Sequence, residues 1–403
     1  MRLLTGPLGA LARPPVSGRL FARGHPARTR SMVRTQILVA GLALCLSGAL
    51  AAQVGNGSSE PAPPQPTSTL LGRLKFGRLE LAVATELVDE LKQRRISARL
   101  HASKILRDHY LRHEKSFLKL SVKVMGDFEK LTKKAQKTLL GKKGRTRVDT
   151  LRTESLTVSR RSDLSKQQIK NDVDPRVANL RELLLPSVTN VLVRDKKLDA
   201  KLTDLRSAHD SLRDWHAVYA SVCEGLELHE DASKHFSKYP PPEHPGEAKR
   251  IDEAISFAMF AGLPMSGSDR KALDSNEAIR ERTPREEYLG TLRLNEIRYL
   301  LGLSLVVVDE KLSDAARDHS KDMATLGFFS HTSPVAGKER FSQRASNFGT
   351  SAGAENIASG QRTGHGAIRA WWYSPGHHRN MLGGHRRTGL GQHQTLWTQM
   401  FGG

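Results

Sequence analysis

Two histidines and one glutamate in the last third of the chain are of types that can do chemistry together. His331 follows two phenylalanines in FFSH, Glu355 lies in the short run AEN, and His377 follows SPG. Neutral imidazoles and a carboxylate are good Zn²⁺ ligands, and two His with one Glu and an open position make up known hydrolytic zinc sites. The same groups can act as acid and base without a metal. His331, Glu355 and His377 are therefore the candidate catalytic or metal-binding residues.

A purely structural alternative applies to the same three residues. Glu355 would then orient His331 through a hydrogen bond, and His377 would support the end of a helix. We expect no serine or cysteine nucleophile beside them, because Cys223 lies outside this part of the chain. The other cysteine, Cys45, falls in an apolar run near the N-terminus, so no internal disulfide is expected once that run is removed.

The elements that must position these residues are predicted by local signals. Pro284 fits a first helical turn, and Gly302 fits the position after the end of that helix. Asp309 is a suitable N-cap for a second helix, which should end near Gly327. Further expectations are a loop around Glu355, a helix over 365–373, a short helix holding His377, and strands over 388–391 and 396–401.

The remaining histidines are expected to play lesser roles. His319 falls on the inner face of the second helix and is predicted to be structural. The spacing of His109 and His113 can clamp a metal, but no third ligand accompanies them in a known pattern. Surface positions are predicted for His109, His113, His378, His385 and His393.

Six short runs follow one another in this part of the chain. They are LNEIR (294–298), HSKDMATLGFFSHTSP (319–334), AENIA (354–358), AWWYSPGHHRNML (370–382), GLG (389–391) and WTQMFG (397–402). In this order they resemble the bacterial branch of the CAP/SCP domain, which belongs to the superfamily of cysteine-rich secretory proteins and antigen 5. The resemblance covers less than a third of the chain and says nothing about residues 53–283.

The resemblance implies an α+β fold over residues 284–403, an α-β-α sandwich with a large cleft. In eukaryotic members two His and two Glu line that cleft and can bind Zn²⁺. His331 matches the first of these histidines and Glu355 the first glutamate, whereas Ser374 and Leu396 stand where the other two would be. His377 matches the histidine of an SPGHR-like motif that bacterial members commonly have. The resemblance also implies that binding of lipids, sterols or proteins is the commoner role.

The rest of the chain divides by composition. Residues 1–52 form a signal-sequence region in which Met32 is an alternative start, so that the signal peptide would cover 32–52 and be cleaved near Ala51 or Ala52. An uncleaved membrane anchor is the alternative. Residues 53–72 are a Pro-rich linker, 73–240 an all-α region that is partly coiled coil, and 241–283 a linker with a short helix.

The helical region has two notable patterns. Leucines at 198, 202, 205 and 212 alternate with histidines and other residues at heptad spacing up to Cys223, which predicts a helical hairpin, a coiled coil or self-association through 198–223. Residues 115–147 carry many lysines and arginines, and the whole chain has a formal charge of +21. Such a charge favours anionic partners. The near absence of interleaved aromatic residues argues against nucleic acid.

Three functions follow from these patterns. The first is a secreted, extracellular or periplasmic, non-enzymatic binding module that takes a small apolar or anionic ligand in a cleft around His331, Glu355 and His377. The second is a zinc-dependent hydrolase or peptidase that uses the same residues. The third is an envelope-anchoring protein that binds anionic polymers or a membrane surface through the basic helices of 115–147. The incomplete set of histidines and glutamates favours the first.

Overall fold

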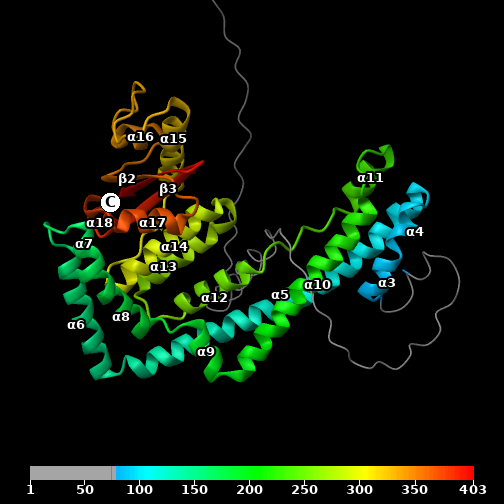
Figure 1. Cartoon of the computed structure of the whole chain (residues 1–403), viewed down its shortest axis with the longest axis horizontal. Helices are drawn as coiled ribbons and strands as arrows, with labels where there is room; N and C mark the ends of the chain where they lie inside the picture. Colours follow the sequence, from blue (N-terminus) through cyan, green and yellow to red (C-terminus); the bar gives the residue numbers. More distant parts are fainter. Residues whose placement is uncertain (1–73, 75–78) are drawn as a thin grey trace, which may run out of the picture.

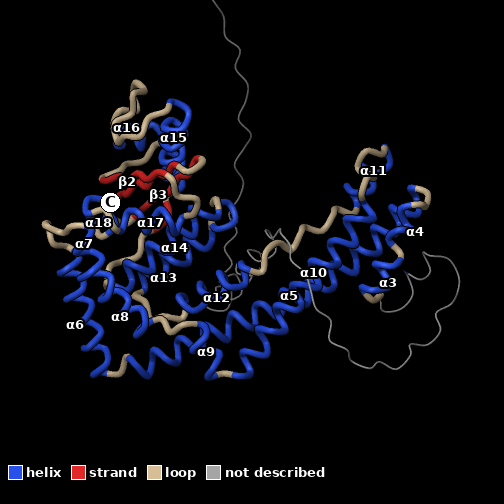
Figure 2. The backbone as a smooth tube through the Cα atoms, in the orientation of Figure 1, coloured by secondary structure: helices blue, strands red, loops and turns tan. Residues whose placement is uncertain are grey.

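The computed structural model describes residue 74 and residues 79–403 of the chain. The predicted signal region (1–52) and Pro-rich linker (53–72) lie outside the described residues. The described part has two regions (Figure 1). A body contains the sheet and its surrounding helices, and a long helical arm extends from it. Figure 2 shows that strands are confined to the body, in the C-terminal part of the chain.

The arm is built on two long helices. Helix α5 (Ile96–Leu139) lies along α10 (Lys196–Cys223), and the short helices α3 (Leu81–Glu86), α4 (Val88–Lys92) and α11 (Glu230–Lys238) lie at the far end (Figure 1). Leu106, Phe117 and Phe128 of α5 are buried with Leu202 and Leu205 of α10 in one apolar cluster. The predicted helical hairpin is therefore formed inside a single chain.

The buried seam of α10 drifts relative to the predicted heptad positions. Its first half is as predicted, but further along Trp215 and Val222 are buried, whereas His216 and Cys223 are only partly covered. A straight helix with 3.6 residues per turn moves away from a 3.5-residue repeat by about 20° per heptad. Self-association through 198–223 stays a prediction, and it would use a face of α10 other than this seam.

A group of shorter helices joins the arm to the body. They are α6 (Lys142–Ser159), α7 (Lys166–Gln168), the π-helical turn η1 (Ile169–Val173), α8 (Asp174–Leu184) and α9 (Val188–Arg194). Leu164, Ile169 and Val173 are buried in the same apolar cluster as Trp371 and Trp397 of the body. The Asp174 carboxylate accepts hydrogen bonds from Trp372 Nε1 and Tyr373 Oη, each at 2.5 Å.

Residues 241–283 are more ordered than the predicted linker with one short helix. Helix α12 (Lys249–Ala261) is the expected short helix, and a second helix, α13 (Gly267–Ala278), precedes a 3-10 turn, η2 (Arg280–Arg282). Ser266 caps α13 by accepting a hydrogen bond from Asp269 N at 3.1 Å. The polar surface of α13 concealed this helix in the sequence, because only Ala272 and Leu273 give it apolar buried contacts.

The body confirms the predicted α+β fold. Its sheet has the order β1-β3-β4-β2, with β1 (Val307–Val308) parallel to β3 (Arg387–His393) and with β4 (Leu396–Gly402) antiparallel to both β3 and β2 (Ala354–Ser359). Helices α15 (Glu310–Leu326) and α16 (Phe341–Asn347) share an apolar cluster with Met400 on one face. The other face, with Leu390 and Trp397, packs against α14 (Arg285–Leu300), α17 (Gly364–Trp372) and α18 (Pro375–Met381).

Two glycines of the GLG run bring α15 onto the sheet. A Cβ atom on Gly389 would lie 2.2 Å from Ser313 N, and one on Gly391 would lie 2.0 Å from Arg317 N. Only glycine allows the strand and the helix to approach this closely. The predicted N-cap Asp309 and the C-terminal Gly327, with φ of 70°, are both present on α15. Among the described residues, none of the helices is long and apolar enough to span a membrane.

Candidate functional site

The three candidate residues meet at the edge of the sheet formed by β2. Glu355 lies in β2 and not in the predicted loop, because all six residues of AENIAS pair with residues 396–401 of β4. Its side chain points to the face covered by α15 and α16. His331 reaches it from the loop after α15, whereas His377 comes from α18 on the opposite layer. The sandwich thus brings together side chains from both layers around one edge strand.

A hydrogen bond joins His331 to Glu355. The distance from His331 Nδ1 to Glu355 Oε1 is 2.9 Å. The glutamate side chain is 1% exposed, but 49% of the histidine side chain is exposed. A carboxylate only accepts hydrogen bonds, so the proton of this bond lies on Nδ1. The other ring nitrogen, Nε2, is left to face a ligand or solvent.

Arg344, on α16, forms a buried ion pair with Glu355. Its Nη2 lies 2.6 Å from Glu355 Oε2, and both side chains are almost completely buried. Arg344 also donates to three backbone carbonyls, those of His331, Lys338 and Glu339, at 3.1, 2.6 and 3.2 Å. A buried charge pair is costly unless its polar atoms are bonded, and both terminal nitrogens of this arginine have partners, whereas its Nε has none among the described residues. It fixes both Glu355 and the loop that carries His331.

His377 completes the group without bonding to Glu355. Its ring lies 5.8 Å from the His331 ring, centroid to centroid. Burial lowers the pKa of His377, and the nearby His331 lowers it further. Asn380, on the same helix, donates to the Glu355 carbonyl at 3.1 Å and to Asn356 Oδ1 at 2.9 Å, which ties α18 to β2. The site therefore has one half-exposed imidazole, a second, half-buried one, and a fixed carboxylate.

The arrangement does not fit a zinc centre with three protein ligands. Both oxygens of Glu355 are engaged, one by the Arg344 guanidinium and one by His331. Among the residues that the structure describes, no group of three or more His, Cys, Asp or Glu side chains is placed to hold a metal ion. Zinc binding by His331, Glu355 and His377 remains a prediction, and we derive no chemical step from it.

His378 corrects one prediction from the sequence. It was expected on the surface, but it is fully buried, with its ring 4.2 Å from that of Trp372 and its Nδ1 2.8 Å from the Trp372 carbonyl oxygen. The reason is that His377 and His378 are consecutive residues of α18, so that when His377 faces the β2 edge, His378 points into the core. His385 and His393 are half-buried rather than on the open surface. His319 is buried and bonded to the Ser330 carbonyl at 3.1 Å, as a structural residue would be.

His109 of the arm also differs from its predicted surface position. Only 9% of the residue is exposed, and its ring stacks on Trp215 of α10 at 5.7 Å. His113 is exposed, as predicted, and stacks on the same tryptophan at 5.5 Å. The two histidines therefore hold one indole ring between the helices, and neither was identified as a contact of the hairpin from spacing alone.

Two contributors to the site were missed in the sequence. Arg344 and Asn380 were not identified as site residues. The signal available in the sequence was a polar residue on a helix that packs against the sheet: Arg344 lies in the run RAS, and Asn380 lies in the run SPGHHRNML. A run matching GxSxG, GTSAG, is present at 349–353. Its Ser351 is exposed in the loop before β2 and not in the turn from a strand to a helix that a nucleophilic serine of this motif needs. It adds no nucleophile to the site.

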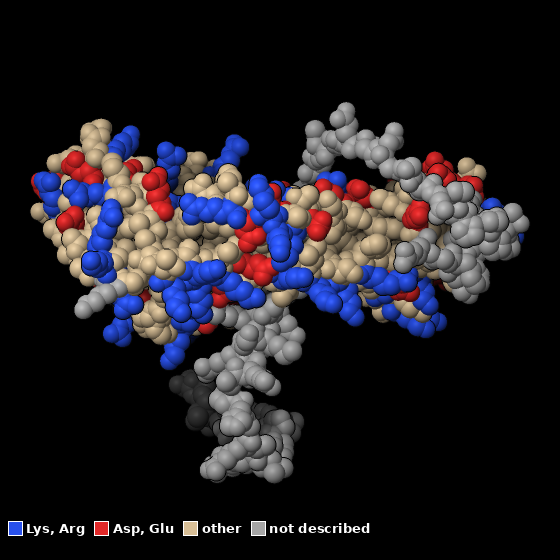
Figure 3. Space-filling model, turned by 90° about the horizontal axis from the view of Figure 1, so that it is seen from below, with Lys and Arg blue, Asp and Glu red and all other residues tan. Residues whose placement is uncertain are grey.

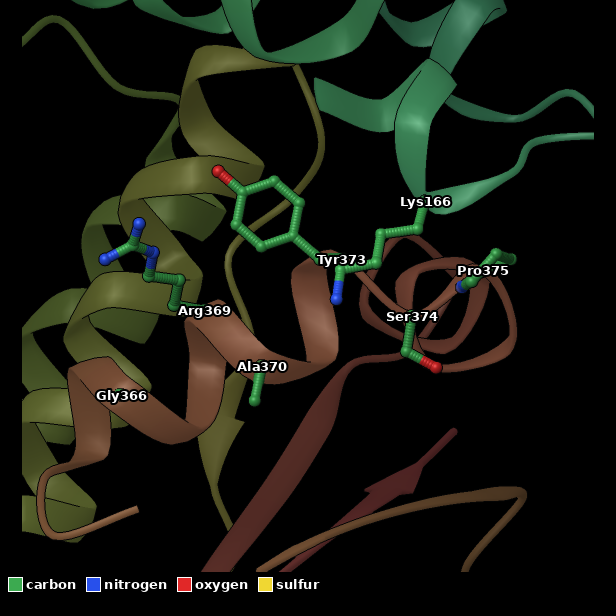
Figure 4. Close-up of a pocket in the computed structure, with 7 residues that line it drawn as sticks. All are labelled: Lys166, Gly366, Arg369, Ala370, Tyr373, Ser374 and Pro375. Carbon is green, nitrogen blue, oxygen red and sulfur yellow. The ribbon is translucent and has the colours of Figure 1, made fainter. Parts of the chain in front are cut away.

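Two surface pockets lie away from this group. One, of about 600 Å³, is bordered by Lys166, Arg369, Tyr373 and Ser374 where α7 meets α17 (Figure 4). The other, of about 670 Å³, lies on the arm beside Tyr219, Cys223 and Phe236. The predicted cleft around His331 corresponds to neither of them. Leu326 at the end of α15 and Phe329 in the loop that carries His331 are 55% and 53% exposed.

Comparison with known families identifies the body. Residues 292–395 match the family model described as the cysteine-rich secretory protein family, CAP. The C-terminal body is a CAP domain. The predicted resemblance is thereby confirmed, and the boundaries of the match lie within the predicted 284–403. The family match says nothing about the arm.

Two curated relatives match part of the chain. The chain is 35% identical over 110 residues to the uncharacterized protein YkwD of Bacillus subtilis (strain 168), a match that spans 27% of this chain and 43% of YkwD. It is 32% identical over 110 residues to the uncharacterized membrane protein YlbC of the same strain, covering 27% and 31% of the two chains. The chain thus spans less than half the length of either relative.

One solved structure is also similar. It is the crystal structure of an extracellular protein containing an SCP domain from Bacillus anthracis str. Ames, with 28% sequence identity, a TM-score of 0.28, and coverage of 34% of this chain and 44% of the other.

Proposed function

We propose that the chain is a secreted or envelope-associated protein whose CAP domain is a non-enzymatic binding module. The ligand is a small amphiphilic anion taken at the β2 edge. One observation carries this proposal: His331 is anchored through Nδ1 to the buried Glu355, so that its half-exposed ring offers Nε2 at the surface. An imidazole held in this way recognises a polar head group without reorganisation.

The surroundings of His331 supply the apolar half of the ligand contact. Phe329 lies two residues away in the same loop and is 53% exposed, and Leu326 at the end of α15 is 55% exposed. Large exposed apolar side chains that are grouped beside polar ones are typical of ligand-binding surfaces. Arg344 already neutralises Glu355, so an anionic head group at His331 meets no uncompensated carboxylate.

Titration of the full chain with dodecanoate tests this proposal. We expect chemical-shift changes in the ring signals of His331 and His377, saturating with ligand, and we expect His331→Leu to abolish the change at His377. His393→Leu is the matched control, because this half-buried histidine lies at the far end of the β3–β4 hairpin. Dodecanoate-induced changes that persist in His331→Leu would contradict the proposed location.

A hydrolase remains the second candidate, and one observation favours it. The contact between a buried carboxylate and an imidazole is the arrangement that orients a general base in many enzymes. In this chain Glu355 would hold the His331 ring while Nε2 removes a proton from water. Hydrolysis of labelled casein by the full chain, lost in His331→Gln and kept in His393→Gln, would favour this candidate over the binding module.

Export is the remaining part of the proposal. Expression of the full chain in a bacterial host, followed by mass spectrometry of the secreted protein, tests it. The expected N-terminus lies at residue 52 or 53, directly after the predicted cleavage near Ala51 or Ala52. Retention of the intact N-terminal region in the cell membrane would show an anchor.

A further inference from the structure

Helix α5 separates its apolar and basic residues onto opposite faces. Phe117, Val124 and Phe128 are buried against the rest of the arm. At about 100° per residue, one sector about 100° wide on the other side contains eight cations. They are Arg112, Lys115, Lys119, Lys123, Lys130, Lys133, Lys134 and Lys137, all of which are exposed. We call this set the lysine row.

Among the residues that the structure describes, the lysine row has few neutralising partners. Its one ion pair there is between Lys130 Nζ and Asp127 Oδ1, at 3.9 Å, and Asp127 also pairs with Lys201 at 2.6 Å. Glu114, Asp127 and Glu129 are the acidic residues of 112–137, and helical geometry places all three outside the sector of the row. Exposed helices usually alternate charges of both signs along one face, which lets neighbours pair. The row does not.

The row is also long and straight. Its first and last members are 25 residues apart, so it extends about 38 Å along the helix axis. The exposed Lys143, Arg145 and Arg147 of α6 follow it in the chain. Figure 3 views the molecule from below Figure 1, and Lys and Arg side chains gather along one long margin of that face. The long α5–α10 hairpin holds the cations in a fixed line.

We propose that the lysine row binds a linear phosphodiester polymer of the cell envelope, one that has no bases. A line of cations about 6 Å apart at i, i+4 spacing fits a line of phosphates, each of which releases a counterion when it is neutralised. Nucleic acid is disfavoured because the exposed face of the row has no aromatic side chain for stacking on bases.

A membrane surface fits the row less well than a polymer. Helices that lie on a bilayer bury an apolar face in it. The apolar face of α5 is already covered by α10, and the large apolar residues that are highly exposed in the described part of the chain are Val193, Leu228, Leu326 and Phe329, none of which is on α5 or α6. The row therefore offers charge alone. This binding is independent of the site at His331.

Binding of the full chain to long-chain polyphosphate, measured against salt concentration, tests the proposal. The row variant changes Lys119, Lys123, Lys133 and Lys137 to Gln, which keeps helix propensity nearly unchanged. Its matched control changes the exposed Lys166, Lys234, Lys271 and Lys321 to Gln, so that both variants lose the same charge. Far-ultraviolet circular dichroism checks that both remain folded.

We expect the row variant to bind at least about tenfold more weakly at low salt. The slope of log affinity against log salt concentration should fall by about three, because each of the four lost lysine–phosphate contacts contributes about 0.7. The control variant should stay within about twofold of the unaltered chain. Equal losses in both variants would show a general charge effect and overturn the proposal. So would a row variant that binds as the unaltered chain does, or an unaltered chain that binds phosphatidylglycerol vesicles but not polyphosphate.

Discussion

The arm and the CAP domain bury their polar residues in different ways. In the CAP domain, two buried arginines are bonded to partners on other elements: Arg298 Nη1 donates to the Met381 carbonyl at 2.8 Å, and Arg344 pairs with Glu355. In the arm, His209 is 1% exposed, its ring lies 6.0 Å from that of Phe117, and the acidic group beside it is Asp210 of the same helix, with Oδ1 3.7 Å from Nδ1. The CAP domain is specified by particular polar contacts, and the arm by a repeating apolar seam.

This contrast has an energetic consequence. A buried ion pair is costly to break, because the remaining partner is an unpaired charge in a poorly solvated place. An apolar seam loses only the contacts that are removed, and the cost depends on how far the neighbours can relax. Substitutions in the two regions should therefore differ in size and in their response to pH.

The largest effect is expected for Arg344→Met. It leaves Glu355 buried without its cation and removes the donor to the His331 carbonyl, so the free energy of unfolding should fall by about 3–5 kcal/mol. Urea unfolding followed by tryptophan fluorescence measures it. Arg362→Met, at an exposed position, is the control and should change stability by less than about 0.5 kcal/mol. A loss below about 1 kcal/mol for Arg344→Met would mean that the pair is not buried as described.

A smaller loss is expected for Leu205→Ala in the arm. This leucine is 0% exposed in the α5–α10 seam, and its truncation should cost about 3 kcal/mol through lost burial and a residual cavity. Circular dichroism of thermal unfolding measures it. Leu228→Ala removes the same atoms from a residue that is 94% exposed, and it should be nearly neutral. Equal effects of the two would argue against an intramolecular seam.

A loss of stability smaller than that of Leu205→Ala is expected when the contact between the connecting helices and the CAP domain is broken. Asp174→Ala removes the acceptor of both Trp372 Nε1 and Tyr373 Oη, so a loss of about 2 kcal/mol is expected. Because Trp372 loses its bond, its fluorescence should change in the folded state as well. Asp163→Ala is the control, since its partner Arg161 is exposed and lies on the same loop. An unchanged Trp372 signal would contradict the docking of α8.

The smallest effect is a pH dependence in the arm. Burial lowers the pKa of His209, so the folded state binds this proton less readily than the unfolded state. The free energy of unfolding therefore has its full value above the pKa of a histidine in the unfolded chain, about 6.5, where His209 is neutral in both states. It decreases as the pH falls below that value, because the unfolded chain then binds the proton more readily. His209→Leu should reduce the loss of stability between about pH 7.5 and about pH 5 by about 1 kcal/mol. His101→Leu, at an exposed site of α5, should leave that loss unchanged.

The same contrast explains what could be predicted from the sequence. The helices of the arm follow from periodicity, and the caps Asp309 and Gly327 follow from local chemistry, because both signals lie within a few residues. The family motifs also located His331, Glu355 and His377. The partner of Glu355 could not be predicted in this way, since Arg344 becomes its neighbour only when α16 packs over β2.

The errors have related physical causes. Burial of His378 depends on which way a seven-residue helix is turned, and α18 offers too few residues for a periodic pattern. Helix α13 lies in the predicted linker, and its contacts are largely polar: Asn276 Nδ2 donates to the Val306 carbonyl at 3.0 Å, and Asn276 Oδ1 accepts from Val308 N at 2.8 Å. A polar residue that bonds to a backbone edge leaves no hydrophobic signal in the sequence.

The central claim is that Glu355 holds His331 by its Nδ1 and leaves Nε2 free at the β2 edge. Two-dimensional proton–nitrogen NMR of the imidazole rings in the full chain, with His331→Gln used for assignment, tests this most directly. We predict that His331 Nδ1 carries a proton and that its signal shows the bond to a carboxylate. A proton found on Nε2 alone, with Nδ1 unprotonated, would contradict the account.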